Sequence, residues 1–233
     1  MAIVQYGNGV SQILGKIAGN VYSKNRYSTY IRNKTSPVQP RTEYQLNQRA
    51  VFAAISATWR SLTPAQQLGW NSAASSKTFV ITNRFGNAVS LSGATLFNQL
   101  NLNLTSAGQT MIMEVPSPVD LPVIEFKMVS SVTSNNLDFI FESDPSVGGT
   151  YSVLYYATPG LSAGVTFVGN RYRLLAANLS VVMDTLTADA IGVFIARFGN
   201  LVAGSQIFGK VIAINNATGQ ASVPAASQII VGS

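Results

Sequence analysis

The sequence predicts a multidomain α+β protein with three parts: a basic N-terminal arm carrying a β-hairpin, a small helical region, and a C-terminal all-β sandwich. Three observations lead to this fold class. Positive charge is concentrated near the N-terminus, helix start signals follow, and short apolar segments separated by turn residues fill the second half. The expected boundaries are 1–42 for the arm, 43–104 for the helices, 105–122 for a linker and 123–233 for the sandwich.

Charge distinguishes the N-terminal part from the rest of the chain. Residues 1–84 hold ten Lys or Arg and one acid, a net charge of +9, whereas the other 149 residues hold five bases and eight acids, a net charge of −3. A basic segment joined to a faintly acidic body indicates that one part binds an anionic surface. Residues 19–34 alternate well enough for a hairpin, with strands at 21–23 and 27–31.

The bases of the arm are interleaved with tyrosines. The candidate partner-binding residues are Tyr22, Lys24, Arg26, Tyr27, Tyr30, Arg32, Lys34 and Arg41. Tyrosine and arginine are preferred anchors of protein interfaces, so the favoured interpretation is an arm that packs on neighbouring subunits and pairs with acidic patches. The same residues could hold nucleic acid, with cations on phosphates and rings stacked on bases.

Three helices are expected between residues 42 and 104. Thr42 is a plausible N-cap for the first helix, which ends at Trp59. The second has a clear start, because Thr63, Pro64 and Gln66 form a capping-box pattern with proline at the first helical position; it should run to about residue 75. The third begins near residue 92. We expect Trp59 and Trp70 to form the core of the helical hairpin.

Beyond residue 105, short segments rich in Val, Ile, Phe and Tyr recur between turn signals, as in a β-sandwich. A proline-rich join at 114–122 forms the expected linker. The candidate strands are 123–130, 137–142, 151–157, 172–176, 190–198, 207–215 and 228–231.

The composition excludes several classes of function. The chain has no cysteine and no histidine, which removes disulfides, thiolate metal sites, the commonest general base and the commonest zinc ligand. Only nine acids are present, scattered along the sequence. We therefore expect no enzyme activity, no metal and no cofactor. No apolar run reaches the length of a membrane span, so no membrane association is expected.

The segment 15–104 resembles a group of uncharacterised proteins of tailed phages and prophages. The matching positions are Arg32–Thr35, Pro40–Thr42, Gln45–Phe52, Trp59–Asn71 and Phe85–Gly93. That resemblance implies a virion-associated protein, assembled in the host cytoplasm, whose partners are capsid, portal or tail proteins and further copies of itself.

Two shorter resemblances concern other parts of the chain. Residues 209–231, GKVIAINNATGQASVPAASQIIV, are similar to the last two strands of a fibronectin type III or immunoglobulin (Ig)-like domain. Because no tryptophan lies in this half, Tyr155, Tyr156 or Phe194 would have to supply the core aromatic ring of such a domain. The spacing within 55–74 resembles two helices of an HMG box, a family that bends DNA.

These patterns favour a structural protein of a tailed-phage particle that binds its neighbours through the N-terminal arm. The alternative is a DNA-binding architectural protein that uses the basic N-terminal half, whose affinity would fall steeply with salt. A third class, a carbohydrate-binding module, would use exposed aromatic residues of the β-region.

Overall fold

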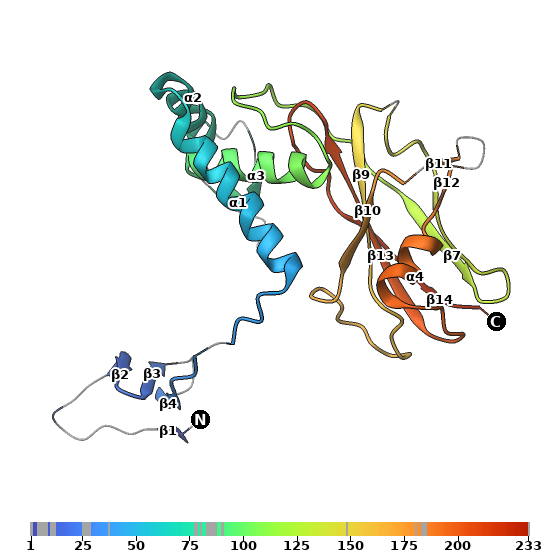
Figure 1. Ribbon diagram of the computed structural model, residues 1–233, viewed down its shortest axis with the longest axis horizontal. Helices are drawn as coiled ribbons and strands as arrows, with labels where there is room; N and C mark the ends of the chain where they lie inside the picture. Colours follow the sequence, from blue (N-terminus) through green and yellow to red (C-terminus); the bar gives the residue numbers. More distant parts are fainter. Residues whose placement is uncertain are drawn as a thin grey trace. The chain divides into compact units, whose positions relative to one another are not determined.

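The computed structural model describes residues 2–3, 9, 13–24, 29–36, 38–76, 79, 81–82, 88–89, 91–147, 149–179, 181–182 and 186–232. It has a mixed α+β fold, divided into two compact units, Met1–Leu46 and Asn47–Ser233 (Figure 1). This division differs from the expected one, because the helices and the β-sandwich region fall into one unit. We refer to Met1–Leu46 as the N-terminal unit and to Asn47–Ser233 as the main unit.

The N-terminal unit contains a four-stranded antiparallel sheet. Its strand order is β1-β4-β3-β2, formed by β1 (Ala2–Ile3), β2 (Gly15–Ile17), β3 (Asn20–Lys24) and β4 (Thr29–Asn33). The predicted hairpin is confirmed as the β3–β4 pair, in which Tyr22 lies opposite Ile31. Strands β1 and β2 were not predicted, so the segment is a small sheet where a hairpin on an extended arm was expected.

The three predicted helices are present as α1 (Glu43–Ser61), α2 (Pro64–Ser75) and α3 (Gly93–Ser106). At the start of α2, the Gln66 amide N–H donates to Thr63 Oγ1 at 3.3 Å, and the Thr63 amide N–H donates to Gln66 Oε1 at 2.9 Å. This reciprocal pair is the predicted capping box. Ser92 caps α3 by accepting from the Thr95 amide N–H at 3.2 Å.

The aromatic core of the helical region centres on Phe97. Trp70 and Phe97 are both fully buried, and their rings meet edge to face with centroids 5.3 Å apart. Trp59 is half-buried and contacts the same ring at 5.4 Å. The core of the helical region therefore includes α3 as well as α1 and α2. Of the two tryptophans expected in the core of the helical hairpin, only Trp70 is fully buried.

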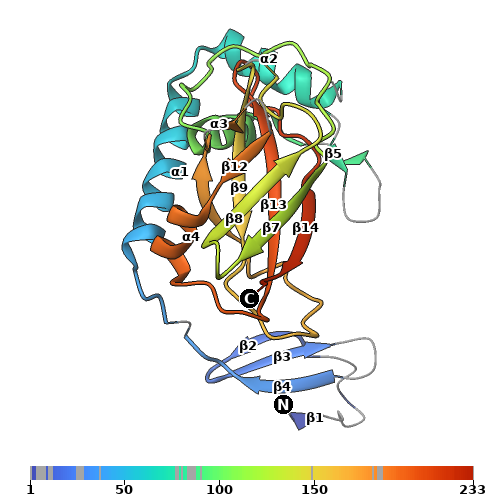
Figure 2. The ribbon, with the colours of Figure 1, turned by 90° about the vertical axis from the view of Figure 1, so that its right-hand side faces the viewer.

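The second half of the main unit contains two four-stranded antiparallel sheets (Figure 2). One sheet has the order β10-β9-β13-β14, from β10 (Arg173–Ala177), β9 (Tyr151–Ala157), β13 (Gln206–Asn215) and β14 (Ala225–Ile230). The other has the order β11-β12-β8-β7, from β11 (Val181–Val182), β12 (Thr187–Asp189), β8 (Asn136–Phe141) and β7 (Phe126–Ser131). A short hairpin, β5 (Ile81–Thr82) with β6 (Ala88–Val89), precedes α3.

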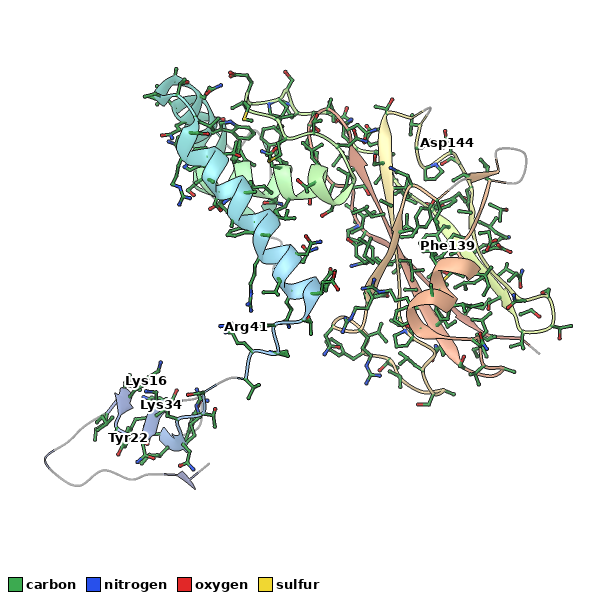
Figure 3. All side chains as sticks on the ribbon, viewed as in Figure 1. Lys16, Tyr22, Lys34, Arg41, Phe139 and Asp144 are labelled. Carbon is green, nitrogen blue, oxygen red and sulfur yellow. The ribbon has the colours of Figure 1, made fainter. Side chains whose placement is uncertain are left out.

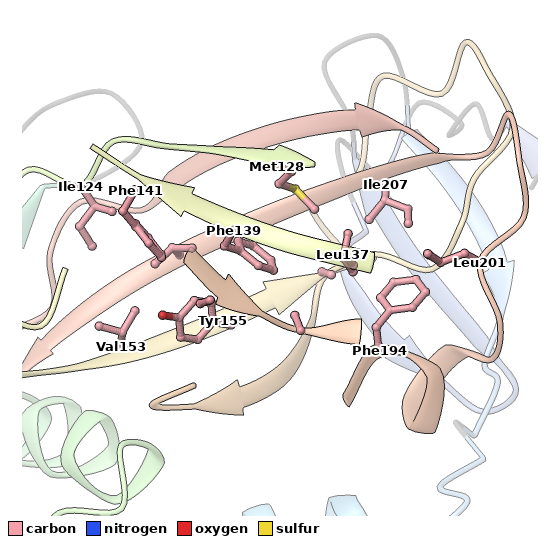
Figure 4. Packing of buried hydrophobic residues seen from close by; sticks show 14 of the residues in the cluster. Ile124, Met128, Leu137, Phe139, Phe141, Val153, Tyr155, Phe194, Leu201 and Ile207 are labelled. Carbon is pink, nitrogen blue, oxygen red and sulfur yellow. The ribbon is translucent and has the colours of Figure 1, made fainter. Parts of the chain in front are cut away.

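One apolar core lies between the two sheets (Figure 4). Phe139 of β8 and Tyr155 of β9 are fully buried and meet edge to face at 5.3 Å. Alternation of buried and partly exposed side chains along β8 contributes to this core. Leu137, Phe139 and Phe141 are every second residue of the strand, so they all point to the same side of it. The predicted sandwich strands thus correspond to β7, β8, β9, β10, β13 and β14, with ends that differ by a few residues.

The prediction of a strand at 190–198 is wrong, because this segment is helix α4 (Ile191–Phe198). Its Ile, Val and Phe content is typical of strands, but the buried Phe194 and the half-buried Phe198 lie one helical turn apart, with ring centroids at 5.1 Å. Asp189 Oδ1 accepts from the Ile191 amide N–H at 2.8 Å at the start of the helix. Gly199, with φ +88°, ends it.

Helix α3 extends to Ser106, and the rest of the expected linker, 107–122, has no regular secondary structure, yet it is fixed to the helices. Trp70 Nε1 donates to the Met113 carbonyl oxygen at 2.8 Å, and the buried Asn101 side chain bonds both the N–H and the carbonyl of Ile112. On the sandwich side, Asn103 Nδ2 donates to the Gly219 carbonyl at 2.9 Å. These contacts explain why helices and sandwich form a single unit.

Candidate interaction surface

The sheet of the N-terminal unit is the candidate interaction surface, because its sequence supplies cations and tyrosines to a sheet whose described side chains form no core. None of the described side chains of this unit is buried, and all four apolar clusters found among the described residues lie in the main unit. Ile17, on the outer strand β2, is 55% exposed. A sheet normally buries one face against a second layer, and the described part of this unit contains no such layer.

The register of the sheet determines which residues share a face. Lys16 of β2 lies opposite Val21 of β3, and Val21 lies opposite Arg32 of β4. Directly opposed residues project to the same side of a sheet, so Lys16 and Arg32 lie on one face with Val21 between them. Tyr30 precedes Arg32 by two residues on β4 and therefore lies on that face too. We call this the Arg32 face.

The opposite face carries two more of the eight predicted partner-binding residues, Tyr22 and Lys24. Tyr22 lies opposite Gly15 and Ile31, and Lys24 lies opposite Thr29 at the end of the hairpin. Tyr22 is half-buried and Lys24 is exposed. We call this the Tyr22 face. Cations therefore occur on both faces of the sheet, each next to a tyrosine.

Two further predicted partner-binding residues, Lys34 and Arg41, lie outside the strands. Lys34 directly follows β4, where its amide N–H donates to the Gly19 carbonyl oxygen at 2.7 Å, and Arg41 lies in the segment before α1 with φ +48° (Figure 3). Both side chains are exposed. Arg26 and Tyr27 lie outside the described residues.

Sequence reasoning missed Lys16 as a member of this surface. Its position depends on the pairing of β2 with β3, which joins Ile17 to Asn20 through a two-residue turn, Ala18-Gly19. A short turn containing glycine between two alternating segments is a known hairpin signal. Ala18 adopts a left-handed conformation, φ +49°, which that type of turn often requires.

The described residues also bear on two other kinds of feature, metal-ligand clusters and membrane-spanning helices. The described part of the chain contains no group of three or more acidic, His or Cys side chains placed to hold a metal ion. None of the described helices combines the length and hydropathy needed to cross a bilayer.

No known family model and no curated protein matches the chain. Among solved structures, it is similar to an Fn3-like protein from Clostridium thermocellum, with 14% identity over 49% of this chain and 97% of that chain, at a TM-score of 0.31. It is also similar to a beta-1,2-glucanase from Parabacteroides distasonis, with 14% identity over 50% of this chain and 14% of that chain, at a TM-score of 0.28. At these TM-scores neither likeness carries an argument about function.

Proposed function

We propose that the protein is a non-enzymatic structural subunit of a tailed-phage particle, and that it binds neighbouring subunits through its N-terminal sheet. One observation carries this proposal: the sheet has no buried described side chain and bears cations on both faces. A sheet of this kind gains stability when another surface covers it. The phage setting rests on the sequence resemblance of residues 15–104.

The charge of the sheet specifies the chemistry of its partner. The N-terminal unit holds six bases and one acid, so it carries +5 of the net +6 of the whole chain. The partner surface is acidic protein, whose carboxylates can accept paired hydrogen bonds from Arg32. Tyr30 and Tyr22 supply the amphipathic contact area that interfaces favour on either face.

The N-terminal sheet is joined in sequence to the main unit, which contains the sandwich. We infer that this sandwich is Ig-like. In an Ig-like domain the two sheets read A-B-E-D and G-F-C, with an optional C′ beside C. The strand orders β7-β8-β12-β11 and β14-β13-β9-β10 support that topology. Tyr155, buried on β9, occupies the core position that a tryptophan of strand C fills in antibody domains.

Co-assembly of variants with the particle tests the proposal. Replacing Lys16 and Arg32 with alanine removes two charges from the Arg32 face, and occupancy in the particle should fall to background. The matched control replaces Arg60 and Lys127, two exposed bases of the main unit, and should assemble like the wild type. Arg32→Lys should also weaken assembly, since lysine keeps the charge but cannot form the bidentate pair. Wild-type occupancy of the double variant would overturn the proposal.

The DNA-binding alternative makes different predictions for DNA affinity and for release of the protein from the particle. Tyr30 and Arg32 on one face could combine a stacking ring with a phosphate-binding cation. In that case the wild-type chain would bind a short DNA duplex with an affinity that falls steeply with salt, and it would leave the particle only when packaged DNA is digested. Retention of the protein after nuclease treatment supports the protein partner.

A further inference from the structure

A polar pocket of about 320 Å³ opens at one end of the sandwich, and the proposed assembly function makes no use of it. Its lining combines uncharged polar side chains with two tyrosines and three aliphatic side chains, those of Val153, Leu179 and Val181. The polar members are Gln109, Ser146, Ser152, Asn178 and Asn216, and the rings are those of Tyr151 and Tyr155. None of the described residues that line it is charged, which distinguishes this pocket from the basic sheet.

The polar side chains of the pocket are held in place by one another. Ser152 Oγ receives hydrogen bonds from Gln109 Nε2 at 3.2 Å and Asn178 Nδ2 at 3.3 Å, and it donates to Asn216 Oδ1 at 2.6 Å. Asn178 Oδ1 accepts from the Val153 amide N–H at 2.9 Å, and Asn216 Nδ2 donates to the Gly149 carbonyl at 3.0 Å. The groups are thus oriented before any ligand arrives.

Several hydrogen-bonding positions remain after these bonds are formed. A side-chain amide has two N–H donors and an oxygen with two lone pairs. Asn178 and Asn216 each use one N–H in the network, so each retains one, and Gln109 retains its Oε1 acceptor. The pocket therefore offers both donors and acceptors from fixed positions.

Tyr155 provides the observation that points to a ligand. The residue is fully buried and its hydroxyl has no hydrogen-bond partner among the described residues, although buried hydroxyls are almost always paired. Its ring is fixed against Phe139 and Phe141, with centroids at 5.3 and 6.1 Å, and its hydroxyl points toward Val153, which also lines the pocket (Figure 4). Burial raises the pKa of this phenol, and the charge of Asp144 raises it further, so the hydroxyl stays protonated.

We propose that this pocket binds a single neutral sugar residue. Sugar hydroxyls both donate and accept hydrogen bonds, which matches the free N–H groups of the two asparagines, the Gln109 oxygen and the Tyr155 hydroxyl. The nearby negative charge of Asp144 opposes an anionic ligand, and the described lining has no cation to hold one. The volume is at the lower end of the range for small-molecule pockets, about 300–1,000 Å³, which suits one ring.

Titration of the full chain with neutral methyl glycosides, followed by NMR, tests this assignment. The probes are the methyl glucoside, galactoside, mannoside and N-acetylglucosaminide. At least one should shift the side-chain amide signals of Asn178 and Asn216 in a saturable way. Tyr155→Phe removes only the unpaired hydroxyl and should weaken that binding about tenfold. Tyr156→Phe, on the opposite face of the same strand, is the matched control and should bind like the wild type.

Three results would overturn the assignment. The first is that none of the four glycosides shifts the two asparagine signals. The second is that Tyr155→Phe binds the glycoside as tightly as the wild type, while its unfolding shows an intact fold. The third is that methyl glucuronide, which carries a carboxylate, binds as tightly as the neutral glycosides.

Discussion

The N-terminal unit and the main unit are both built on antiparallel sheets, but they are stabilised in different ways. In the main unit, strands and helices enclose side chains such as Trp70, Phe97, Phe139 and Tyr155, each with essentially no exposed surface. In the N-terminal unit no described side chain reaches that state. Burial of apolar surface is the largest favourable term in folding, so the main unit has its own source of stability. Under the proposed function, the N-terminal sheet gains the corresponding stability from a partner.

Charge follows the same division. The N-terminal unit has a net charge of +5 over 46 residues, whereas the main unit holds nine bases and eight acids over the rest of the chain. The unit whose described side chains are all at least partly exposed is thus also the one with the large excess of positive charge. A region that folds on its own can have nearly balanced charge, while a region that docks benefits from complementarity.

The largest expected effect comes from the centre of the helical core. Trp70→Ala should lower the free energy of unfolding by about 3–5 kcal/mol, because a fully buried ring and its bond to the Met113 carbonyl are both lost. Urea unfolding followed by circular dichroism measures this. Tyr22→Ala, which removes a half-buried ring from the N-terminal unit, should change the same quantity by less than about 1 kcal/mol. An equal loss of unfolding free energy in the two variants would show that the two units do not differ in how burial stabilises them.

A second substitution tests whether helices and sandwich act as one unit. Gly219 has φ +72°, and a Cβ atom there would lie 3.0 Å from the carbonyl carbon of Leu100 in α3. Gly219→Ala should therefore destabilise the main unit by about 2–4 kcal/mol, through backbone strain and overpacking together. The measurement is the unfolding midpoint in urea.

Gly204→Ala is the matched control for this experiment. Gly204 has a similar φ of +75°, but a Cβ atom added there would meet no described atom within 4 Å, so only the conformational strain of about 1 kcal/mol is expected. Similar losses in the two variants would show that the contact between α3 and the 215–220 turn contributes nothing to the stability of the main unit.

Much of the main unit could be predicted because its signals are local. The Thr63–Gln66 capping box and the Ser92 cap fix two helix starts within a few residues. Alternation identifies β8, and a short run rich in Tyr, Val and Leu identifies β9. Helix α4 was missed because Ile, Val and Phe favour strands by composition, while the packing of Phe194 and Phe198 follows a helical period.

The two candidate sites were less accessible to sequence reasoning because they depend on pairings between distant segments. Tyr22, Lys24, Tyr30 and Arg32 were identified as candidates, but their separation onto two faces follows from the β3–β4 register. The role assigned to them stays a prediction. The polar pocket gathers Gln109, Ser152, Asn178 and Asn216 from four separate stretches, and no local pattern marks them as neighbours.

A smaller effect is expected at the start of α4. Asp189→Ala removes the acceptor of the Ile191 amide N–H and should cost about 1 kcal/mol in the free energy of unfolding. Asp189→Asn retains a side-chain oxygen and should lose less than half of that. If the two variants are equally destabilised, the charge of Asp189, and not this hydrogen bond, supports the helix.

The smallest effect on stability, and the sharpest test of the comparison, is expected in the N-terminal unit. Replacing Lys16 and Arg32 with alanine removes two exposed cations from one face and no described buried contact, so the free energy of unfolding should change by less than about 0.5 kcal/mol. Binding to the proposed acidic partner should nevertheless fall to background, because two of the charges that would pair with its carboxylates are removed. Parallel unfolding and co-assembly measurements separate the two quantities. A variant that loses stability and binding together would show that these cations hold the sheet itself together, and the N-terminal unit would then resemble the main unit in being stabilised from within.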